Sequence, residues 1–199
     1  MASEQVALPV SGPGSVTVFR YTDYDVPFWA RPNTRPGRWN EVGDPPTQYW
    51  SMTPDAAWAE LIRAKDLYAE EELDLVRMPM WVCRVSVMGL IDLHDPDTMD
   101  GCGLTHEMLI GDDWTPCQQA GPVLWEEMRG VIAPSAALDG HASLTIFGAR
   151  RAIDWRGKPA LASTLPAARA AVGRPPPGLI PKVRRKAGGA PQAHLFDDA

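Results

Sequence analysis

Side chains able to do chemistry are concentrated in residues 37–60, GRWNEVGDPPTQYWSMTPDAAWAE. Arg38 offers a fork of N–H donors that suits phosphate oxygens. Trp39 and Tyr49 carry flat rings that can stack on a planar ligand. Glu60 carries a carboxylate, which can stabilise positive charge as it develops on a substrate. A cation, two rings and a carboxylate in so short a stretch indicate a binding or catalytic site rather than a core.

Two predicted strands would hold part of this set. The alternating sequence SVTVFRY predicts a strand that ends at Arg20 and Tyr21, which point to opposite faces. The sequence TQYWSM predicts a second strand, with Tyr49 and Ser51 on one face.

A predicted helix would hold the carboxylate. Thr53 is suited to be its N-cap, Pro54 its first residue and Asp55 a favourable charge in its first turn. Apolar residues recur at helical spacing, so this helix is expected to run to about residue 70. Glu60 then lies on an ordered element rather than on a loop.

The remaining patterns predict an α+β protein. Further strands are expected in MWVCRVSV, GLIDL and ASLTIFGA, and GVIAPSAA is a short apolar run that turns at Pro134-Ser135. A second helix is expected in TPCQQAGPVLWEEM, capped by Thr115-Pro116 and broken or kinked at Gly121-Pro122. Short strands with two or three helices indicate a single compact domain of small mixed or antiparallel sheets with surrounding helices. We expect a flexible N-terminus at 1–14, the domain at 15–164, and a flexible basic tail rich in Pro and Gly at 165–199.

Composition excludes several classes of function. The four His show no HxxxH or HExxH spacing, which argues against a metal site, and the three Cys lack CxxC spacing, which favours a reducing compartment without disulfides. No apolar run approaches the roughly 18 residues of a membrane span, and no signal peptide is evident. We therefore expect a soluble, cytoplasmic protein.

The charge distribution argues against nucleic-acid binding by the main domain. The chain carries a net charge of −6. Residues 161–199 hold six Lys or Arg and two Asp, a net +4, so the first 160 residues carry −10. An acidic body repels a phosphate backbone. The basic run KVRRK at 182–186 could touch such a backbone or an acidic partner, but a solvated tail explains it as well.

Each candidate residue also has an ordinary structural explanation. Arg20 at a strand end could form a surface ion pair, and Trp39 could cover a core. Tyr49 could serve packing alone. Glu60 could be solvated and paired with Arg63 or Lys65 on the same helix.

The segments VFRY, GRWNEVG, YWSMTPDAAWAE, GVIAPSAA and LTIFG resemble the RES domain family, over about residues 16–150. The resemblance implies a fold like that of ADP-ribosylating toxins. It implies the toxin of a toxin–antitoxin pair that depletes NAD by cleaving the nicotinamide–ribose bond, by phosphorolysis or hydrolysis. NAD is then the substrate, inorganic phosphate a possible co-substrate, and no cofactor or metal is needed. The implied partner is an Xre-like helix-turn-helix antitoxin, which would form a hetero-oligomer with the chain.

The resemblance also implies roles for particular residues. Arg38, Glu60 and Ser135 are expected to be catalytic. The residues expected to bind NAD are Arg20, Tyr21, Arg38, Trp39, Tyr49, Glu60 and Ser135. Two other functions stay open: a protein ADP-ribosyltransferase with the same NAD pocket, and a binding module without catalysis.

Overall fold

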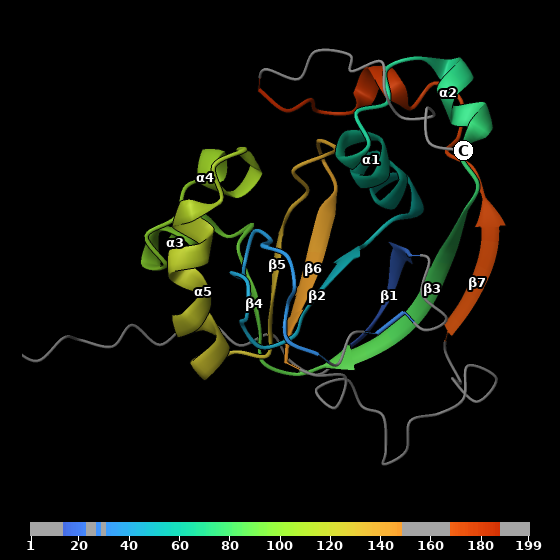
Figure 1. Ribbon diagram of the computed structural model, residues 1–199. Coiled ribbons are helices and arrows are strands. Elements are labelled where there is room, and N and C mark those ends of the chain that lie inside the picture. Colours follow the sequence, from blue (N-terminus) through green and yellow to red (C-terminus); the bar gives the residue numbers. More distant parts are fainter. Residues whose placement is uncertain (1–13, 23–26, 29–30, 149–167, 188–199) are drawn as a thin grey trace, which may run out of the picture.

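The computed structural model describes residues 14–22, 27–28, 31–148 and 168–187 (Figure 1). Within these ranges seven strands form one sheet, and the predicted α+β class is confirmed. The strands are β1 (Gly14–Tyr21), β2 (Thr47–Ser51), β3 (Met78–Val87), β4 (Leu90–Asp92), β5 (Gly130–Pro134), β6 (Ala142–Phe147) and β7 (Ala168–Gly173). The helices are α1 (Pro54–Ala64), α2 (Glu70–Leu75), α3 (Pro96–Gly101), α4 (His106–Ile110), α5 (Thr115–Glu127) and a short 3-10 helix, η3 (Ile180–Lys182).

The sheet is weakly joined at its centre. Its order is β4-β5-β6-β2-β1-β3-β7, and only β4 and β5 run parallel. β1 and β3 pair along eight residues of each strand, whereas β1 and β2 share the single pair Phe19↔Ser51. The two halves of the sheet therefore diverge beyond this pair, and α1 contacts both β1 and β2.

Helices group on the two sides of this divergence. In Figure 1, α3, α4 and α5 lie together beside β4 and β5, whereas α1 and α2 lie near the ends of β1 and β3. Two apolar clusters match this grouping. One joins α1 and α2 to Leu179 and Val183, and the other joins α3, α4 and α5 to β4 and β5. None of the helices in the described ranges has the length and apolar character that crossing a bilayer requires.

The helix that carries Glu60 begins as predicted but ends earlier. The Thr53 side chain accepts a hydrogen bond from the nitrogen of Ala56, which confirms it as the N-cap. The helix ends at Ala64 rather than near residue 70, because Asp66 adopts a left-handed backbone conformation with φ of 51°.

The sequence predicted a break or a kink at Gly121-Pro122. The break is wrong, because α5 runs from Thr115 to Glu127 with Pro122 inside it, and the kink stays a prediction. Gly121 permits close packing at this point: a Cβ added there would lie 2.8 Å from the carbonyl oxygen of Trp39. The N-cap is Trp114 rather than Thr115, which is the first helical residue.

The expectation of a flexible tail from 165 is wrong for residues 168–187. β7 pairs antiparallel with β3, from Ala168↔Cys83 to Gly173↔Met78. Leu179 and Val183 are buried in the cluster with α1 and α2. These apolar residues, spaced between prolines and glycines, have enough surface to bury, so the segment packs. Residues 1–13, 165–167 and 188–199 of the two expected flexible ends lie outside the described ranges.

Candidate active site

A pocket of about 520 Å³ lies where β1 and β2 diverge. Its wall combines the ends of β1 and β2, the turn at Gly37–Trp39, α1, the segment before α5 and the end of β5. The lining residues selected from the sequence are Arg20, Tyr21, Arg38, Trp39, Tyr49 and Glu60. Residues far apart in the chain are thus brought together as expected. Ser135 does not line the pocket, although its neighbours Pro134 and Ala136 do.

A tight turn presents Arg38 to the pocket. The nitrogen of Gly37 donates to the oxygen of Asn40 at 2.9 Å, and the nitrogen of Asn40 donates back to Gly37 at 3.3 Å. The amide of Gln118 on α5 donates to the same two oxygens, at 2.9 and 3.2 Å. A Cβ at Gly37 would lie 2.5 Å from the hydroxyl of Tyr49, so this close approach requires glycine.

Tyr49 holds this turn in place. Its hydroxyl accepts from the nitrogen of Trp39 at 2.9 Å and donates to Oδ1 of Asn40 at 2.7 Å. Burial raises the pKa of Tyr49 above its ordinary value. The hydroxyl is therefore neutral, and both of these hydrogen bonds are made within the protein. A ligand can contact only the part of Tyr49 that lines the pocket.

Arg38 is oriented by backbone carbonyls. One guanidinium nitrogen donates to the oxygen of Met108 at 3.2 Å and the other to the oxygen of Gly111 at 2.9 Å. The guanidinium carbon of Arg38 lies 6.0 Å from the ring centroid of Trp114. Burial lowers the pKa of Arg38, yet a guanidinium stays charged at neutral pH. The site thus contains a fixed cation.

Glu60 faces this cation from α1. Burial raises the pKa of its carboxyl group, while Arg63, Arg38 and a hydrogen bond from Ser135 act in the opposite direction. The net pKa lies above the ordinary value of 4.5. The carboxylate is held among cations in a place where its charge is poorly solvated, so its electrostatic effect on a bound ligand is strong.

Ser135 reaches the pocket only through Glu60. It is 3% exposed, and its hydroxyl oxygen accepts from the nitrogens of Ala137 and Leu138, each at 3.2 Å. The hydroxyl hydrogen is then available to Glu60. This geometry makes Ser135 a positioning residue for the carboxylate. The direct contact of Ser135 with NAD that the resemblance implied stays a prediction, and the burial of its side chain does not favour such a contact.

Arg20 and Tyr21 come from opposite faces of β1, and both line the pocket at the end of that strand. Arg20 donates to the oxygen of Pro27 at 3.0 Å and lies 5.6 Å from the ring centroid of Trp50. Burial and the charge of Glu60 raise the pKa of Tyr21 to about 12, against the influence of Arg20. Tyr21 therefore carries a neutral hydroxyl that interacts electrostatically with the carboxyl group of Glu60.

Two tryptophans have positions that the sequence could not distinguish. The side chain of Trp39 is 1% exposed and packs in the cluster of α3, α4 and α5, which does not favour the expected stacking on a ligand. Trp114 lines the same pocket and is 37% exposed. The ring best placed to stack on a ligand is therefore Trp114.

Among the lining residues that sequence reasoning missed are three charged residues and a tryptophan: Arg63, Asp112, Lys186 and Trp114. Arg63 donates to the oxygen of Ala136 and forms an ion pair with Asp112. Its position three residues after Glu60 had suggested only a surface pair. Within the described ranges no three His, Cys, Asp or Glu gather as a metal site.

Comparisons with known proteins identify one family of similar sequences. The RES domain family model matches residues 16–166. The chain is 32% identical over 127 residues to the probable NAD(+) phosphorylase Rv3189 of Mycobacterium tuberculosis. The aligned region covers 63% of this chain and 60% of that protein. It is 31% identical over 104 residues to the NAD(+) phosphorylase MbcT of Mycobacterium bovis, covering 50% of this chain and 55% of MbcT. The chain thus spans less than two thirds of the length of these relatives.

A solved structure has a similar fold. The crystal structure of the M. tuberculosis MbcT–MbcA toxin–antitoxin complex matches with a TM-score of 0.61 and 26% sequence identity. The match covers 81% of this chain and 86% of the matched chain. The similarity in fold extends over most of the chain.

Proposed function

The chain belongs to the RES domain family, and on this basis we propose that it is the NAD-degrading toxin of a toxin–antitoxin pair. It cleaves the nicotinamide–ribose bond of NAD and transfers the ADP-ribosyl group to inorganic phosphate. The names of its relatives favour phosphate over water as the acceptor.

The observation that carries the proposal is the position of Glu60. A carboxylate whose solvation is poor faces a pocket of about 520 Å³, among Arg38, Arg63 and a Ser135 hydrogen bond. This volume lies within the range usual for small-molecule sites. The pocket thus combines a carboxylate, which can stabilise positive charge that develops on the ribose, with arginines, which can bind phosphate groups.

The chemistry follows from these charges. As the bond between the ribose carbon and the nicotinamide nitrogen breaks, its electron pair goes to the nitrogen, and the pyridinium leaves as neutral nicotinamide. Positive charge develops on the ribose, as in the hydrolysis of sugars. Glu60 stabilises that charge. A phosphate oxygen then supplies the electron pair for the new bond, and the phosphate proton is released to solvent.

No general acid is needed, because the leaving group departs as a neutral molecule. A site without histidine is sufficient for this reaction. Arg38 binds the charged oxygens of NAD or of phosphate, since a guanidinium has five N–H donors and the hydrogen bonds to Met108 and Gly111 use only some of them. Arg20, which lines the same pocket, contributes a second positive charge for these oxygens. The protein needs no cofactor, and the cytoplasm, where NAD is available, is its proposed location.

An antitoxin completes the proposed system. The solved structure that resembles this chain is a toxin–antitoxin complex, which supports an antitoxin as the partner. We propose that this partner is of the Xre-like helix-turn-helix kind and silences the toxin in a hetero-oligomer. Copurification of the chain with the product of a neighbouring helix-turn-helix gene tests this part.

The activity is tested by incubating the protein with NAD, with and without inorganic phosphate, and resolving the products by mass. We expect nicotinamide and ADP-ribose-1″-phosphate only when phosphate is present. Glu60→Gln should lower turnover by about 10²-fold or more, whereas Glu71→Gln, an exposed change on α2, should leave it unchanged.

Other products would change the conclusion. ADP-ribose formed without regard to phosphate would make the protein a hydrolase. Labelled NAD that leaves its label on a protein would make it an ADP-ribosyltransferase. Intact NAD under all these conditions would contradict the proposed function.

A further inference from the structure

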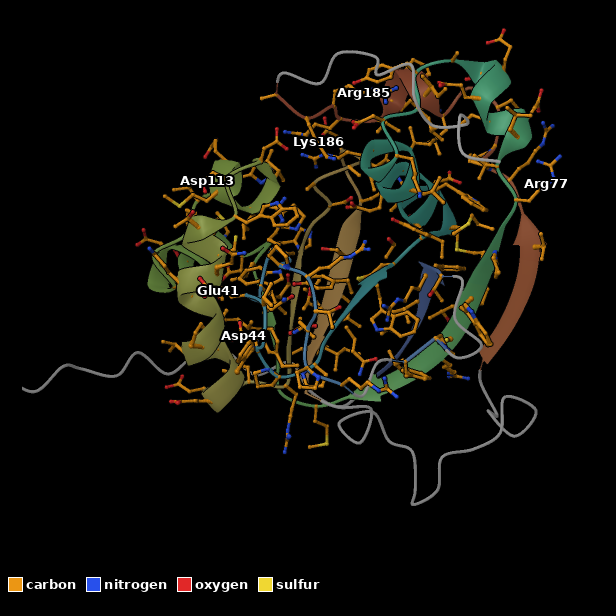
Figure 2. All side chains as sticks on the ribbon, viewed as in Figure 1. Glu41, Asp44, Arg77, Asp113, Arg185 and Lys186 are labelled. Carbon is orange, nitrogen blue, oxygen red and sulfur yellow. The ribbon has the colours of Figure 1, made fainter. Side chains whose placement is uncertain are left out.

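Lys186 lines the pocket although it lies twenty residues beyond the end of the family match at residue 166. Figure 2 shows it at the end of the C-terminal segment, between α1 and α4. The other basic residues of the pocket come from the part of the chain that matches the family. Lys186 is thus a cation that this segment adds to the site.

The segment that carries Lys186 is firmly attached. Val183 and Leu138 form a β-bridge, and the nitrogen of Arg184 donates to the oxygen of Ala137 at 2.9 Å. Leu179 and Val183 are 4% and 6% exposed. The backbone before Lys186 therefore has a defined path across the loop that follows β5.

The residue after Lys186 is fixed to the pocket rim. The nitrogen of Ala187 donates to one oxygen of Asp112 at 2.5 Å. The other oxygen of Asp112 pairs with Arg63. The pKa of Asp112 is lowered overall, because these hydrogen bonds and charges outweigh the effect of burial. One carboxylate thus holds the end of the segment against α1, and Lys186 cannot move far from the opening.

The basic residues at the end of the KVRRK run differ in what they contact. Arg184 forms an ion pair with Asp139. Arg185 donates to the oxygen of Leu67 and lies 4.4 Å from the ring centroid of Tyr68. Both arginines therefore attach the segment to the domain. Lys186 is exposed and forms no ion pair with another residue of the described ranges, so its ammonium group is available to a ligand.

We propose that Lys186 binds a phosphate group of the ligand at the rim of the pocket. The inference rests on the proposed function, because that function supplies the two sources of this chemistry: the pyrophosphate of NAD and free inorganic phosphate. An ammonium group binds phosphate as a point charge and has no geometric requirement as strict as that of a guanidinium. It suits a rim position, where the ligand enters from solvent.

The test compares the wild-type chain with Lys186→Ala, Lys186→Arg and the matched control Lys182→Ala. Lys182 is exposed on the same segment and lies outside the pocket, so its removal takes away the same charge elsewhere. Binding of ADP-ribose and of inorganic phosphate is measured separately by calorimetry, and NAD turnover is measured alongside.

We expect Lys186→Ala to weaken binding of at least one probe by about tenfold, the size of one charge-assisted hydrogen bond. Lys186→Arg should retain most of the affinity, and Lys182→Ala should match the wild type. A loss confined to ADP-ribose assigns Lys186 to the pyrophosphate. A loss confined to phosphate assigns it to the co-substrate.

Equal affinities in Lys186→Ala and Lys182→Ala, for both probes, would overturn the proposal even if NAD is consumed. If NAD stays intact but Lys186→Ala still weakens ADP-ribose binding, the proposed function fails and the role of Lys186 stands. A wild-type chain that binds neither probe contradicts both.

Discussion

The hydroxyl of Tyr49 accepts a hydrogen bond from the backbone nitrogen of Trp39 at 2.9 Å. Through this bond a strand residue sets the position of the turn, and the turn sets the position of Arg38. The cation of the site is thus placed by contacts made one residue away from it. A defect in this bond should affect the ligand without removing any group that touches it.

Tyr49→Phe tests this relationship. The change leaves Oδ1 of Asn40 without its donor and the Trp39 nitrogen without its acceptor, which should cost about 1–3 kcal/mol of unfolding free energy. We expect a higher KM for NAD with the aromatic ring retained. Tyr68→Phe is the control, because the hydroxyl of Tyr68 makes no hydrogen bond within the described ranges. Chemical denaturation and steady-state kinetics measure both effects, and equal results for the two variants would contradict the role of Tyr49.

The pH dependence of turnover should reveal the state of Glu60. In the proposed mechanism catalysis requires the carboxylate, and the pKa of Glu60 lies above 4.5. Activity should therefore fall on the acid side at a pH higher than an ordinary glutamate would give. The contribution of Glu60 to the free energy of unfolding changes with pH in the opposite direction to activity. This stabilisation is fully present below pH 4.5 and is lost as the pH rises through the raised pKa, because the folded state binds the carboxyl proton of Glu60 more tightly than the unfolded state does.

Ser135→Ala should move the acid limb of that profile further toward neutral pH. The change removes a hydrogen bond that favours the carboxylate, so the pKa of Glu60 rises. A merely structural role would lower the protein's stability without moving the limb. Asp95→Ala is the control, because it removes the capping hydrogen bond to Thr98 on α3, outside the pocket. An unchanged limb in Ser135→Ala would contradict the proposed positioning of Glu60.

Gly121→Ala should be destabilising, although alanine is usually the better residue in a helix. The added Cβ would lie 2.8 Å from the oxygen of Trp39, so α5 or the turn must shift. We expect a loss of about 1–3 kcal/mol in unfolding free energy and weaker NAD binding. Gln119→Ala, an exposed change on the same helix, should have little effect. A Gly121→Ala variant as stable as this control would show that the helix and turn are less closely packed.

Leu179→Ala should show that the C-terminal segment belongs to the folded domain. Leu179 is 4% exposed in the cluster with α1 and α2, so truncation should cost about 2–5 kcal/mol. Val172→Ala on β7 removes a side chain that is 71% exposed and should cost far less. Thermal unfolding distinguishes the two. Equal melting temperatures would indicate that the segment adds little to stability.

Local signals in the sequence predicted the elements that carry the site. The alternation before Tyr21, the Thr53 cap and the pattern around Tyr49 depend on neighbouring residues alone, and the structure confirms these elements. The resemblance to the RES family brought together residues that are far apart in the chain, and the structure places six of them on one pocket.

What the sequence could not predict depends on distant contacts. The close packing of α5 on the turn depends on Gly121, because the carbonyl of Trp39 occupies the space that a side chain at this position would need. The burial of Trp39 and the exposure of Trp114 depend on how α5 packs, and both residues are simply tryptophan in the sequence. Likewise, the composition of residues 168–187 is typical of a tail, and only the apolar surface offered by α1 and α2 gives Leu179 and Val183 a place to pack.

The single residue pair between β1 and β2 also has a consequence for translation. β2 pairs mainly with β6, and β1 pairs mainly with β3, so the two sides of the pocket are completed by separate and later parts of the chain. A nascent chain that ends before β6 has β1 and β3 but no partner to hold Tyr49 in its strand. The pocket therefore forms only after residue 147 has left the ribosome, and Lys186 joins it later still. On the proposed function, this order of assembly prevents the nascent chain from consuming NAD before β6 has emerged.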